Sequence, residues 1–414
     1  MVRVFPFKGL RPLPENASEI ASPPYDVLNA REAKEIVINS PNSFLKVNKA
    51  ECDFDTPIEP YSKIVYQKAK ENLQSLINKG LMVQDQVFCF YMYKLTFNKQ
   101  SQTGLCCVMA IEDYENGLIK KHEHTRPDKV KDRANHINYL EAQVGPVFSI
   151  FKNNNPIDEL FERLTEQKPE ILFKSEDGVT HEFWIIQDLK MIESIQVNFK
   201  NLSCTYIADG HHRSESAAEV VRQKFECNKH SSYGSYEYFL NVLFPDNQIK
   251  ILPYNRIVKK PEGTTVKEIL KRARSHFNIT INKGGKISPD TPHTFSLYAE
   301  GVWYKMELLD GQLNNDDPVC EIDTEVLQQY FIDPILEISD PKTDNRIQFV
   351  GGIRGNDELK KHVDSGEYDI AFSLYPTTVH QLLRVADAQK VMPPKSTWFE
   401  PKLRSGMVVH LLED

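Results

Sequence analysis

The stretch YIADGHHRSESAAEV, residues 206–220, decides how the chain around it is expected to fold. Residues 202–209, LSCTYIAD, have the composition of a strand, and residues 215–226, ESAAEVVRQKFE, have the apolar spacing of a helix. We therefore expect the strand to end at Ala208 and the helix to begin near Ser214. The turn between them holds Asp209, Gly210, His211, His212 and Arg213.

This junction has the chemistry of an anion-binding site. The first N–H groups of a helix lack intrahelical partners, and the helix dipole favours negative charge there. Gly210 lets the backbone approach a ligand closely, and His211 and His212 add hydrogen-bond donors. Arg213 can hold a phosphate with two parallel hydrogen bonds. Asp209 suits a magnesium ion carried by a phosphate, or a hydroxyl that must be oriented. The alternative is an ordinary polar turn with two surface histidines.

Length and composition place the chain among globular proteins. Its 414 residues are enough for two or three domains, and 40% are hydrophobic and 26% charged. The net charge of −8 gives no field that attracts nucleic acid, which is not expected as a partner. The seven cysteines lack C-x-x-C spacing and fit reduced thiols. No segment is typical of a signal peptide or a membrane span, so we expect a soluble cytoplasmic protein.

Helix and strand patterns follow one another along the chain and predict an α+β fold with mixed sheets. Five prolines in the first 25 residues predict an extended arm. The expected elements are helices at 61–79 and 128–143, strands at 86–97, 104–114 and 146–151, and an insertion or small subdomain around 153–180. A boundary near residue 260 then gives three regions, namely an N-terminal α/β region (1–110), a catalytic core with an insertion (111–260) and a C-terminal α+β region (261–414).

A second cluster of reactive residues lies at 120–136, KKHEHTRPDKVKDRANH. In an extended segment His122 and His124 share one face, and Glu123 takes the other. Glu123 is a candidate general base towards a hydroxyl, provided that burial or a like charge raises its pKa. On the following helix, Asp132 and His136 stand at i, i+4 on one face, with Lys129 and Arg133 beside them. His122, His124, Arg133 and His136 are candidate substrate-binding residues. The alternative is a solvated charged loop that leads into an ordinary surface helix.

Two proline-containing segments offer further candidates. The C-terminal segment PPKSTWFEPKLRSG has basic and hydroxyl side chains that suit a phosphorylated or acidic ligand, namely Lys395, Ser396, Thr397, Lys402 and Arg404. Near the N-terminus, SPPYD could bring Ser22, Tyr25 and Asp26 to the same site. The alternative is a polar loop packed on the core in the first case and a rigid turn in the second.

Six segments, in this order, resemble one known family. They are ASPPYDVL (21–28), KHEHT (121–125), DRANHINYLEAQVGPVFSIF (132–151), ADGHHRSESAAE (208–219), FVGGIRG (349–355) and VMPPKSTWFEPKLRSG (391–406). On these segments the chain is identified as a member of the bacterial and archaeal domain-of-unknown-function family numbered ten-fifteen. The resemblance covers essentially the whole chain, but it indicates relationship rather than activity.

The Asp-Gly-His-His-Arg string also resembles the phosphate-binding signature of the ParB and sulfiredoxin superfamily, which includes free-serine kinases with the same string. The resemblance implies a ParB/sulfiredoxin-like core with additional α/β elements at both ends. It also implies that Glu123 activates the serine hydroxyl and that residues 209–213 hold the nucleotide phosphates. His211 stands where sulfiredoxin has its redox cysteine, and no helix-turn-helix pattern is present, so sulfinic-acid repair and DNA partitioning are not expected.

The function that follows from these residues is phosphoryl transfer from ATP or ADP to a small hydroxyl compound such as free L-serine. Glu123 and Asp209 are the expected catalytic residues, and Asp209 is also the expected ligand of Mg²⁺. The chain has no Walker A or dinucleotide-binding glycine motif. One alternative is a metal-dependent hydrolase with ligands from His122, His124, His136, His211 and His212. Another is a non-catalytic nucleotide-binding switch. The phosphoryl donor, the acceptor and the oligomeric state are left open.

Overall fold

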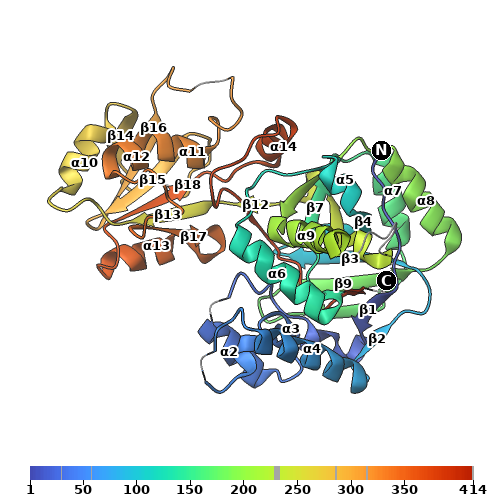
Figure 1. Cartoon of the computed structure of the whole chain (residues 1–414). Coiled ribbons are helices and arrows are strands. Elements are labelled where there is room, and N and C mark those ends of the chain that lie inside the picture. Colours follow the sequence, from blue (N-terminus) through green and yellow to red (C-terminus); the bar gives the residue numbers. More distant parts are fainter. Residues whose placement is uncertain (29, 57, 228–233, 285–286, 314–315, 413–414) are drawn as a thin grey trace. The chain divides into compact units, whose positions relative to one another are not determined.

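The computed structural model consists of two compact units (Figure 1). Unit 1 comprises Met1–Ile249 together with Pro401–Asp414, and unit 2 comprises Lys250–Glu400. The structure describes residues 1–28, 30–56, 58–227, 234–284, 287–313 and 316–412. Each unit has its own sheets and its own hydrophobic clusters.

The largest element of unit 1 is an eight-stranded mixed sheet in the order β5-β10-β7-β11-β4-β3-β9-β8. The strands are β3 (Phe90–Phe97), β4 (Gln100–Ala110), β5 (Ile119–Lys120), β7 (Val147–Phe151), β8 (Ile171–Lys174), β9 (Thr180–Ile186), β10 (Thr205–Asp209) and β11 (Tyr238–Pro245). β10 is parallel to β5 and β11 is parallel to β7, whereas β10 and β7 are antiparallel. Apolar residues fill the central strands because both faces are covered, as the fully buried β7 illustrates.

Helices bury their apolar faces against this sheet. They are α5 (Ile111–Glu115), α6 (Pro127–Leu140), α7 (Asn155–Leu164), α8 (Leu189–Lys200) and α9 (His211–Cys227). Ala134 of α6, Ile157 of α7, Ile195 of α8 and Ala218 of α9 belong to one buried cluster with strand residues such as Phe151. α6 and α9 also pack on each other, and small residues at their buried positions allow the close approach.

A second sheet of unit 1, in the order β2-β1-β20-β6, joins the two ends of the chain. Its strands are β1 (Gly9–Pro12), β2 (Met82–Gln84), β6 (Ala142–Gln143) and β20 (Val409–Leu411). The helical elements before residue 80 are η1 (Pro14–Asn16), α1 (Ala17–Ile20), α2 (Ala30–Asn39), α3 (Leu45–Asn48), η2 (Ala50–Asp53) and α4 (Lys63–Asn78). The C-terminal strand β20 lies between β1 and β6, so the last residues of the chain complete unit 1.

Unit 2 is built on a six-stranded antiparallel sheet in the order β14-β16-β15-β18-β13-β17. The strands are β13 (Tyr254–Val258), β14 (Phe277–Ile281), β15 (Thr294–Ala299), β16 (Val302–Leu308), β17 (Ile347–Gly351) and β18 (Ile370–Leu374). The helices are α10 (Val266–Ala273), α11 (Asp323–Leu327), α12 (Asp333–Leu336), α13 (Gly355–Asp364) and α14 (Val379–Asp387). β12 (Ile251–Leu252) pairs with β19 (Trp398–Phe399), which brings the two ends of unit 2 together.

The α+β class with mixed sheets is confirmed, but the chain divides differently from the three expected regions. β3 and β4 of the expected first region share a sheet with β7, β10 and β11 of the second. Residues 153–180 supply α7 and β8 to the same unit and are no separate subdomain. Residues 111–115 are helical, and only 104–110 continue the expected strand. The division into units differs from the expectation because strand partners are chosen by long-range packing that local patterns do not specify.

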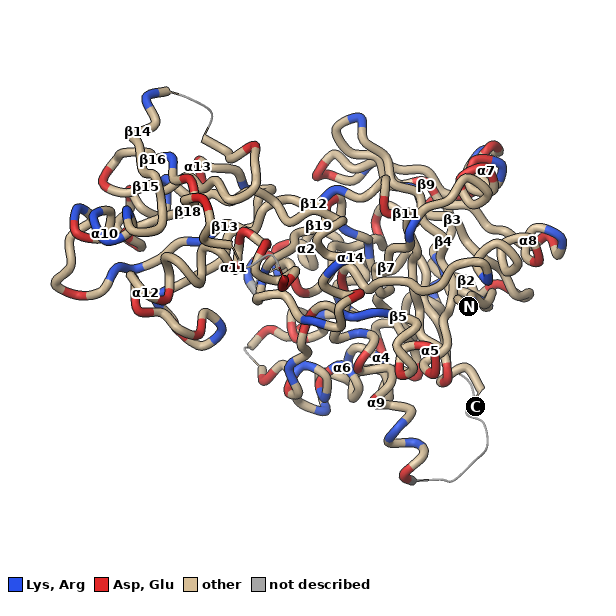
Figure 2. Tube along the Cα trace, turned by 90° about the horizontal axis from the view of Figure 1, so that it is seen from above, with Lys and Arg blue, Asp and Glu red and all other residues tan. Residues whose placement is uncertain are grey.

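Three chain-wide expectations can be compared with the described residues. Among them, no helix is both long and apolar enough to span a bilayer. The six cysteines whose side chains are described carry free thiols. Figure 2 shows acidic and basic residues interspersed along most of the trace rather than segregated. The helix expected at 61–79 is confirmed as α4, and Val65, Tyr66, Ala69, Leu73 and Leu76 form its buried face.

Candidate active site

The strand-to-helix turn predicted at residues 208–214 is confirmed. β10 ends at Asp209, Gly210 has a φ of +97°, and α9 begins at His211. A Cβ atom at Gly210 would lie 3.4 Å from the Cα of Val147 on the neighbouring strand, and an L side chain rarely adopts this φ. Glycine at this position therefore allows both the positive φ of the turn and the close approach of the backbone to Val147. The helix starts three residues earlier than expected, which puts His211, His212 and Arg213 in its first turn.

The first turn of α9 places backbone N–H groups at the positive end of the helix. The N–H groups of Arg213 and Ser214 donate to the carbonyl oxygen of Gly210, at 2.8 and 3.1 Å. The N–H groups of His211 and His212 precede these bonds, at the positive end of a 17-residue helix. This is the geometry that binds phosphate at helix N-termini in other proteins.

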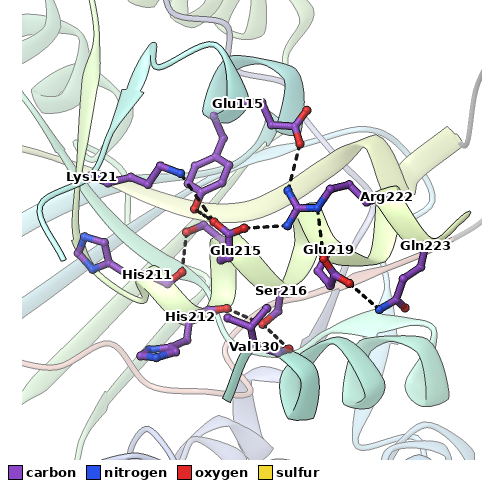
Figure 3. A network of polar contacts seen from close by, with 12 residues as sticks. Glu115, Lys121, Val130, His211, His212, Glu215, Ser216, Glu219, Arg222 and Gln223 are labelled. Atoms are coloured by element: carbon purple, nitrogen blue, oxygen red, sulfur yellow. Dashed lines mark hydrogen bonds and ion pairs between the residues drawn. The ribbon is translucent and has the colours of Figure 1, made fainter. Parts of the chain in front are cut away.

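Polar contacts fix the direction of α9 (Figure 3). The hydroxyl of Ser216 donates to the carbonyl oxygens of Val130 in α6 and of His212, at 3.0 and 2.5 Å. Glu215 accepts from the hydroxyl of Tyr114 and from Arg222, at 2.5 and 2.7 Å. These side chains lie along the sides of the helix after its first turn. They therefore position the N-terminus of the helix and leave its N–H groups accessible to a ligand.

Asp209 forms an ion pair with Lys402, whose Nζ lies 2.7 Å from Oδ2. Burial alone would raise the pKa of Asp209, but the charges of Lys402 and Arg213 outweigh it and hold the pKa well below its usual value. Asp209 is therefore ionised at neutral pH. The pairing places Lys402, from the C-terminal segment, at the 209–213 turn.

Glu123 lies beside the same turn. Its Oε2 is 3.6 Å from Nδ1 of His211, and its side chain is 44% exposed whereas that of His211 is 2% exposed. The N–H of His122 donates to Nε2 of His211 at 3.4 Å. Because Nε2 accepts that bond, we assign the proton of the neutral imidazole to Nδ1, which faces Glu123.

His122 and His211 are both buried, with ring centroids 4.5 Å apart in an edge-to-face arrangement. Burial lowers the pKa of His122 to about 4. Burial and the neighbouring His122 lower the pKa of His211 well below its usual value. Both imidazoles are therefore neutral at pH 7, so they donate and accept hydrogen bonds rather than supply positive charge.

Arg213 is held from several sides. Its Nη1 donates to the carbonyl oxygen of Pro146 at 2.8 Å, and its Nη2 lies 3.4 Å from Oδ2 of Asp26. Its guanidinium lies over the ring of Tyr25, with 5.8 Å to the centroid. The side chain is only 13% exposed, so Arg213 is a positioned group and not the freely exposed arginine that a surface turn implies. The segment SPPYD reaches the site, as the sequence suggested for Tyr25 and Asp26.

The remaining histidines near the site have separate environments. His136 is buried, and its Nε2 lies 3.0 Å from the carbonyl oxygen of Val47. His212 accepts a hydrogen bond at Nε2 from the N–H of Arg126, at 3.1 Å. His124 is exposed. Within the described part of the chain, no group of three or more His, Cys, Asp or Glu side chains is arranged to hold a metal ion. The histidine shell expected for a metal-dependent hydrolase is therefore not formed by these residues.

The other C-terminal candidates have local partners. Arg404 pairs with Asp177 and lies 3.3 Å from the hydroxyl of Ser175, both of which are outside the 209–213 turn. Lys395, Ser396 and Thr397 belong to unit 2. There the hydroxyl of Ser396 is buried and bonds to the hydroxyl of Thr324 at 2.7 Å and to the carbonyl oxygen of Pro393 at 2.8 Å.

A pocket of unit 1 adjoins Arg213 and contains residues that the motifs did not indicate. Tyr25, Arg133, His136 and Arg213 line it together with Asn48. Asn48 ends the four-residue helix α3 in an unremarkable segment, SFLKVNKA, so no local pattern distinguishes it. Arg133 and His136 were candidates, and the structure places both beside Arg213.

The fold and the site define a class: an α+β protein in which a glycine turn leads from a sheet strand into a helix and is flanked by carboxylates. The chain belongs to the family described as "Protein of unknown function (DUF1015)", whose model matches residues 4–325. No curated protein matches the chain.

Several solved structures are similar at low identity. A free serine kinase in complex with AMP is 12% identical, with a TM-score of 0.36 over 71% of this chain and 86% of that one. A conserved hypothetical protein from Pyrococcus furiosus is 13% identical, with a TM-score of 0.35 over 73% and 94%. SbnI from Staphylococcus aureus, truncated at its C-terminus, is 9% identical, with a TM-score of 0.37 over 72% and 85%. TM-scores below 0.5 do not establish a shared fold, so the function of this chain is argued from its own residues.

Proposed function

We propose that this chain transfers a phosphoryl group from ATP or ADP to the hydroxyl of free L-serine. The observation that carries the proposal is the convergence at one turn of backbone donors, the positioned Arg213, the ionised Asp209–Lys402 pair and Glu123. Donors for a phosphate and a carboxylate for a hydroxyl proton are the parts that this reaction requires. A ParB/sulfiredoxin-like core around the turn is part of the same proposal, on the Asp-Gly-His-His-Arg resemblance.

In this mechanism the phosphates bind at the N-terminus of α9. The N–H groups of the first turn and the guanidinium of Arg213 stabilise the negative charge on the transferring phosphoryl group. Arg213 is pre-oriented by its bond to Pro146, so little reorganisation is needed when charge develops. Lys402 adds a second positive charge next to Asp209.

Glu123 takes the proton from the serine hydroxyl. The hydroxyl oxygen then forms its bond to the terminal phosphorus while the bond from that phosphorus to the bridging oxygen breaks, and the electron pair leaves with the nucleotide. Nδ1–H of His211 faces Glu123 at 3.6 Å and orients the carboxylate. The partial exposure of Glu123 leaves room for an acceptor beside it.

Magnesium fits this site through one residue. The ionised carboxylate of Asp209 is the hard oxygen ligand that Mg²⁺ prefers, and a bound nucleotide would supply the other oxygens. Such an ion would neutralise phosphate charge. The same carboxylate, which Lys402 holds in place, could instead orient the hydroxyl of the acceptor.

The test is turnover of the full chain with ATP or ADP and a panel of hydroxyl compounds, with mass spectrometry of the products. Phosphoserine is the expected product. Glu123→Gln keeps the shape of the side chain but cannot take the proton, so turnover should fall roughly 10²–10⁴-fold with nucleotide affinity unchanged. Unchanged turnover in folded Glu123→Gln would remove this residue from the mechanism. Nucleotide binding without any product would indicate a binding module instead.

A further inference from the structure

The pocket beside Arg213 has no role in the mechanism so far. It belongs to unit 1 and has an empty volume of about 460 Å³, including space open to solvent. Its polar lining consists of Tyr25, Asn48, Arg133, His136, Gln143 and Arg213. Arg213 belongs both to this lining and to the phosphate turn. A ligand in the pocket would therefore lie next to the proposed phosphate site.

One buried donor in this lining has no partner. Asn48 is only 4% exposed, and its Nδ2 makes no hydrogen bond within the described part of the chain. A buried amide without a partner costs free energy of folding, and such groups are rare in native proteins. The cost is recovered if a bound ligand offers an acceptor, so this amide points to an anionic or carbonyl-bearing ligand.

Arg133 supplies a fixed cation next to Asn48. Its Nε donates to Oδ2 of Asp132 at 2.8 Å, and its Nη1 lies 3.5 Å from the carbonyl oxygen of Asn48. The guanidinium also lies over the ring of Tyr25, 4.6 Å from the centroid. These contacts hold the planar guanidinium in one orientation, which is the preorganisation that favours a planar two-oxygen ligand.

His136, another polar group of the lining, carries no charge. Burial and the charge of Arg133 lower the pKa of His136 to about 3, so its imidazole is neutral at pH 7. Arg133 and Arg213 each have an acidic neighbour, Asp132 and Asp26. Because these carboxylates partly neutralise both guanidinium groups, the lining suits a ligand with a single negative charge better than a nucleotide triphosphate, which has several.

We propose that this pocket binds the carboxylate of the acceptor, with Asn48 and Arg133 as its direct ligands. The acceptor is then a small hydroxy acid or hydroxy amino acid, held by its carboxylate while its hydroxyl is presented to the phosphate turn. This inference rests on the proposed kinase function, and it assigns acceptor specificity to residues outside the Asp-Gly-His-His-Arg motif.

The first test is the variant Asn48→Leu, because the substitution removes an amide whose Nδ2 has no partner. Its melting temperature should equal or exceed that of the unchanged chain. Its KM for L-serine should rise about 10–100-fold, the range for a hydrogen bond to a charged group, while its KM for nucleotide stays constant. Arg133→Lys, which keeps the charge but loses the fork, should also raise the KM for L-serine.

Asn72→Leu is the matched control. Nδ2 of Asn72 already donates to the carbonyl oxygen of Lys46 at 2.9 Å and to Asp53 at 3.2 Å. This variant should therefore melt earlier and keep its KM for L-serine. An unchanged KM in Asn48→Leu would overturn the proposal. Equal turnover of L-serine and serinol, which lacks the carboxylate, would overturn it as well.

Calorimetry without nucleotide tests the proposed carboxylate pocket independently of the proposed kinase activity. L-serine, serinol and inorganic phosphate are titrated into the full chain and into Asn48→Leu. Asn48-dependent binding of L-serine alone supports the pocket even if no product forms. Binding of serinol as tight as that of L-serine overturns the pocket. Asn48-dependent binding of phosphate also overturns it, because the pocket would then belong to the phosphate site.

Discussion

At the residue scale, the pairing of Asp209 with Lys402 controls the ionisation of the carboxylate that follows β10. Lys402 is the largest of the charges that lower the pKa of Asp209 against the effect of burial. In Lys402→Met this charge is lost, so the pKa of the half-buried Asp209 should rise. Activity needs the ionised form and is lost as pH falls through that pKa. The acid limb of the kcat/KM profile should therefore move to higher pH.

The pH profile of Lys402→Arg provides the control for this prediction. Arginine restores the positive charge, so the acid limb should return towards that of the unchanged chain even if the geometry is imperfect. An acid limb that stays in place in Lys402→Met would show that Asp209 does not set the profile.

Arg213 illustrates how a buried contact changes an expectation based on the motif. As a freely exposed anion ligand it would matter for catalysis alone, but its contacts with Pro146 and Asp26 give it a share in folding. Arg213→Lys cannot form the planar fork, and turnover should fall on the order of 10²–10³-fold, comparable to the loss of one preorganised donor. The melting temperature should fall as well. Full activity with a lowered melting temperature would make Arg213 a structural residue.

At the scale of the element, the turn from β10 into α9 depends on one backbone conformation. Gly210 combines a φ of +97° with a neighbouring backbone atom 3.4 Å from where its Cβ would be. Gly210→Ala should lower the free energy of unfolding by about 1–2 kcal/mol and displace the first N–H groups of α9. Nucleotide affinity, measured by calorimetry, should fall further than in a variant that loses the same free energy of unfolding at another position.

Gly117→Ala is the matched control, because Gly117 also has a positive φ, +73°, but open space around it. It should show a similar loss of stability and normal nucleotide binding. Equal nucleotide affinity in the two variants would mean that the close approach at Gly210 has no part in binding.

At the scale of the whole molecule, unit 1 contains several buried neutral histidines. Burial lowers the pKa of His122 and His410 to about 4 and that of His136 and His181 to about 3. In the unfolded chain these groups titrate near pH 6.5. Between about pH 4 and 6.5 the unfolded state therefore binds more protons, so the stability of unit 1 is complete above this window and declines as pH falls through it.

The expected slope is about 1.4 kcal/mol per pH unit for each histidine within this window. Trp184 lies in unit 1, and replacing Trp303 and Trp398 of unit 2 by phenylalanine leaves it as the sole fluorescent indole for urea unfolding. His410→Gln should reduce the dependence of the free energy of unfolding on pH by roughly the contribution of one histidine. Stability that is constant from pH 7 to 5 would show that these histidines are not buried and neutral.

The sequence alone determined the α+β class, the family relationship and the turn at 209–213, because each depends on residues adjacent in the chain or on motifs in order. A strand, a glycine and an amphipathic helix specify such a turn locally. The resemblance also indicated Glu123, which lies beside His211 in the structure.

Only the tertiary structure decided which distant residues meet at that turn. Lys402 and Arg404 are both basic and two residues apart, yet one pairs with Asp209, 193 positions away, and the other with Asp177. Asn48 became a candidate only because its buried Nδ2 makes no hydrogen bond within the described part of the chain. The division into two units likewise follows from strand pairing across the chain. These features depend on long-range packing and on the environment of each side chain, which periodicity and local motifs do not encode.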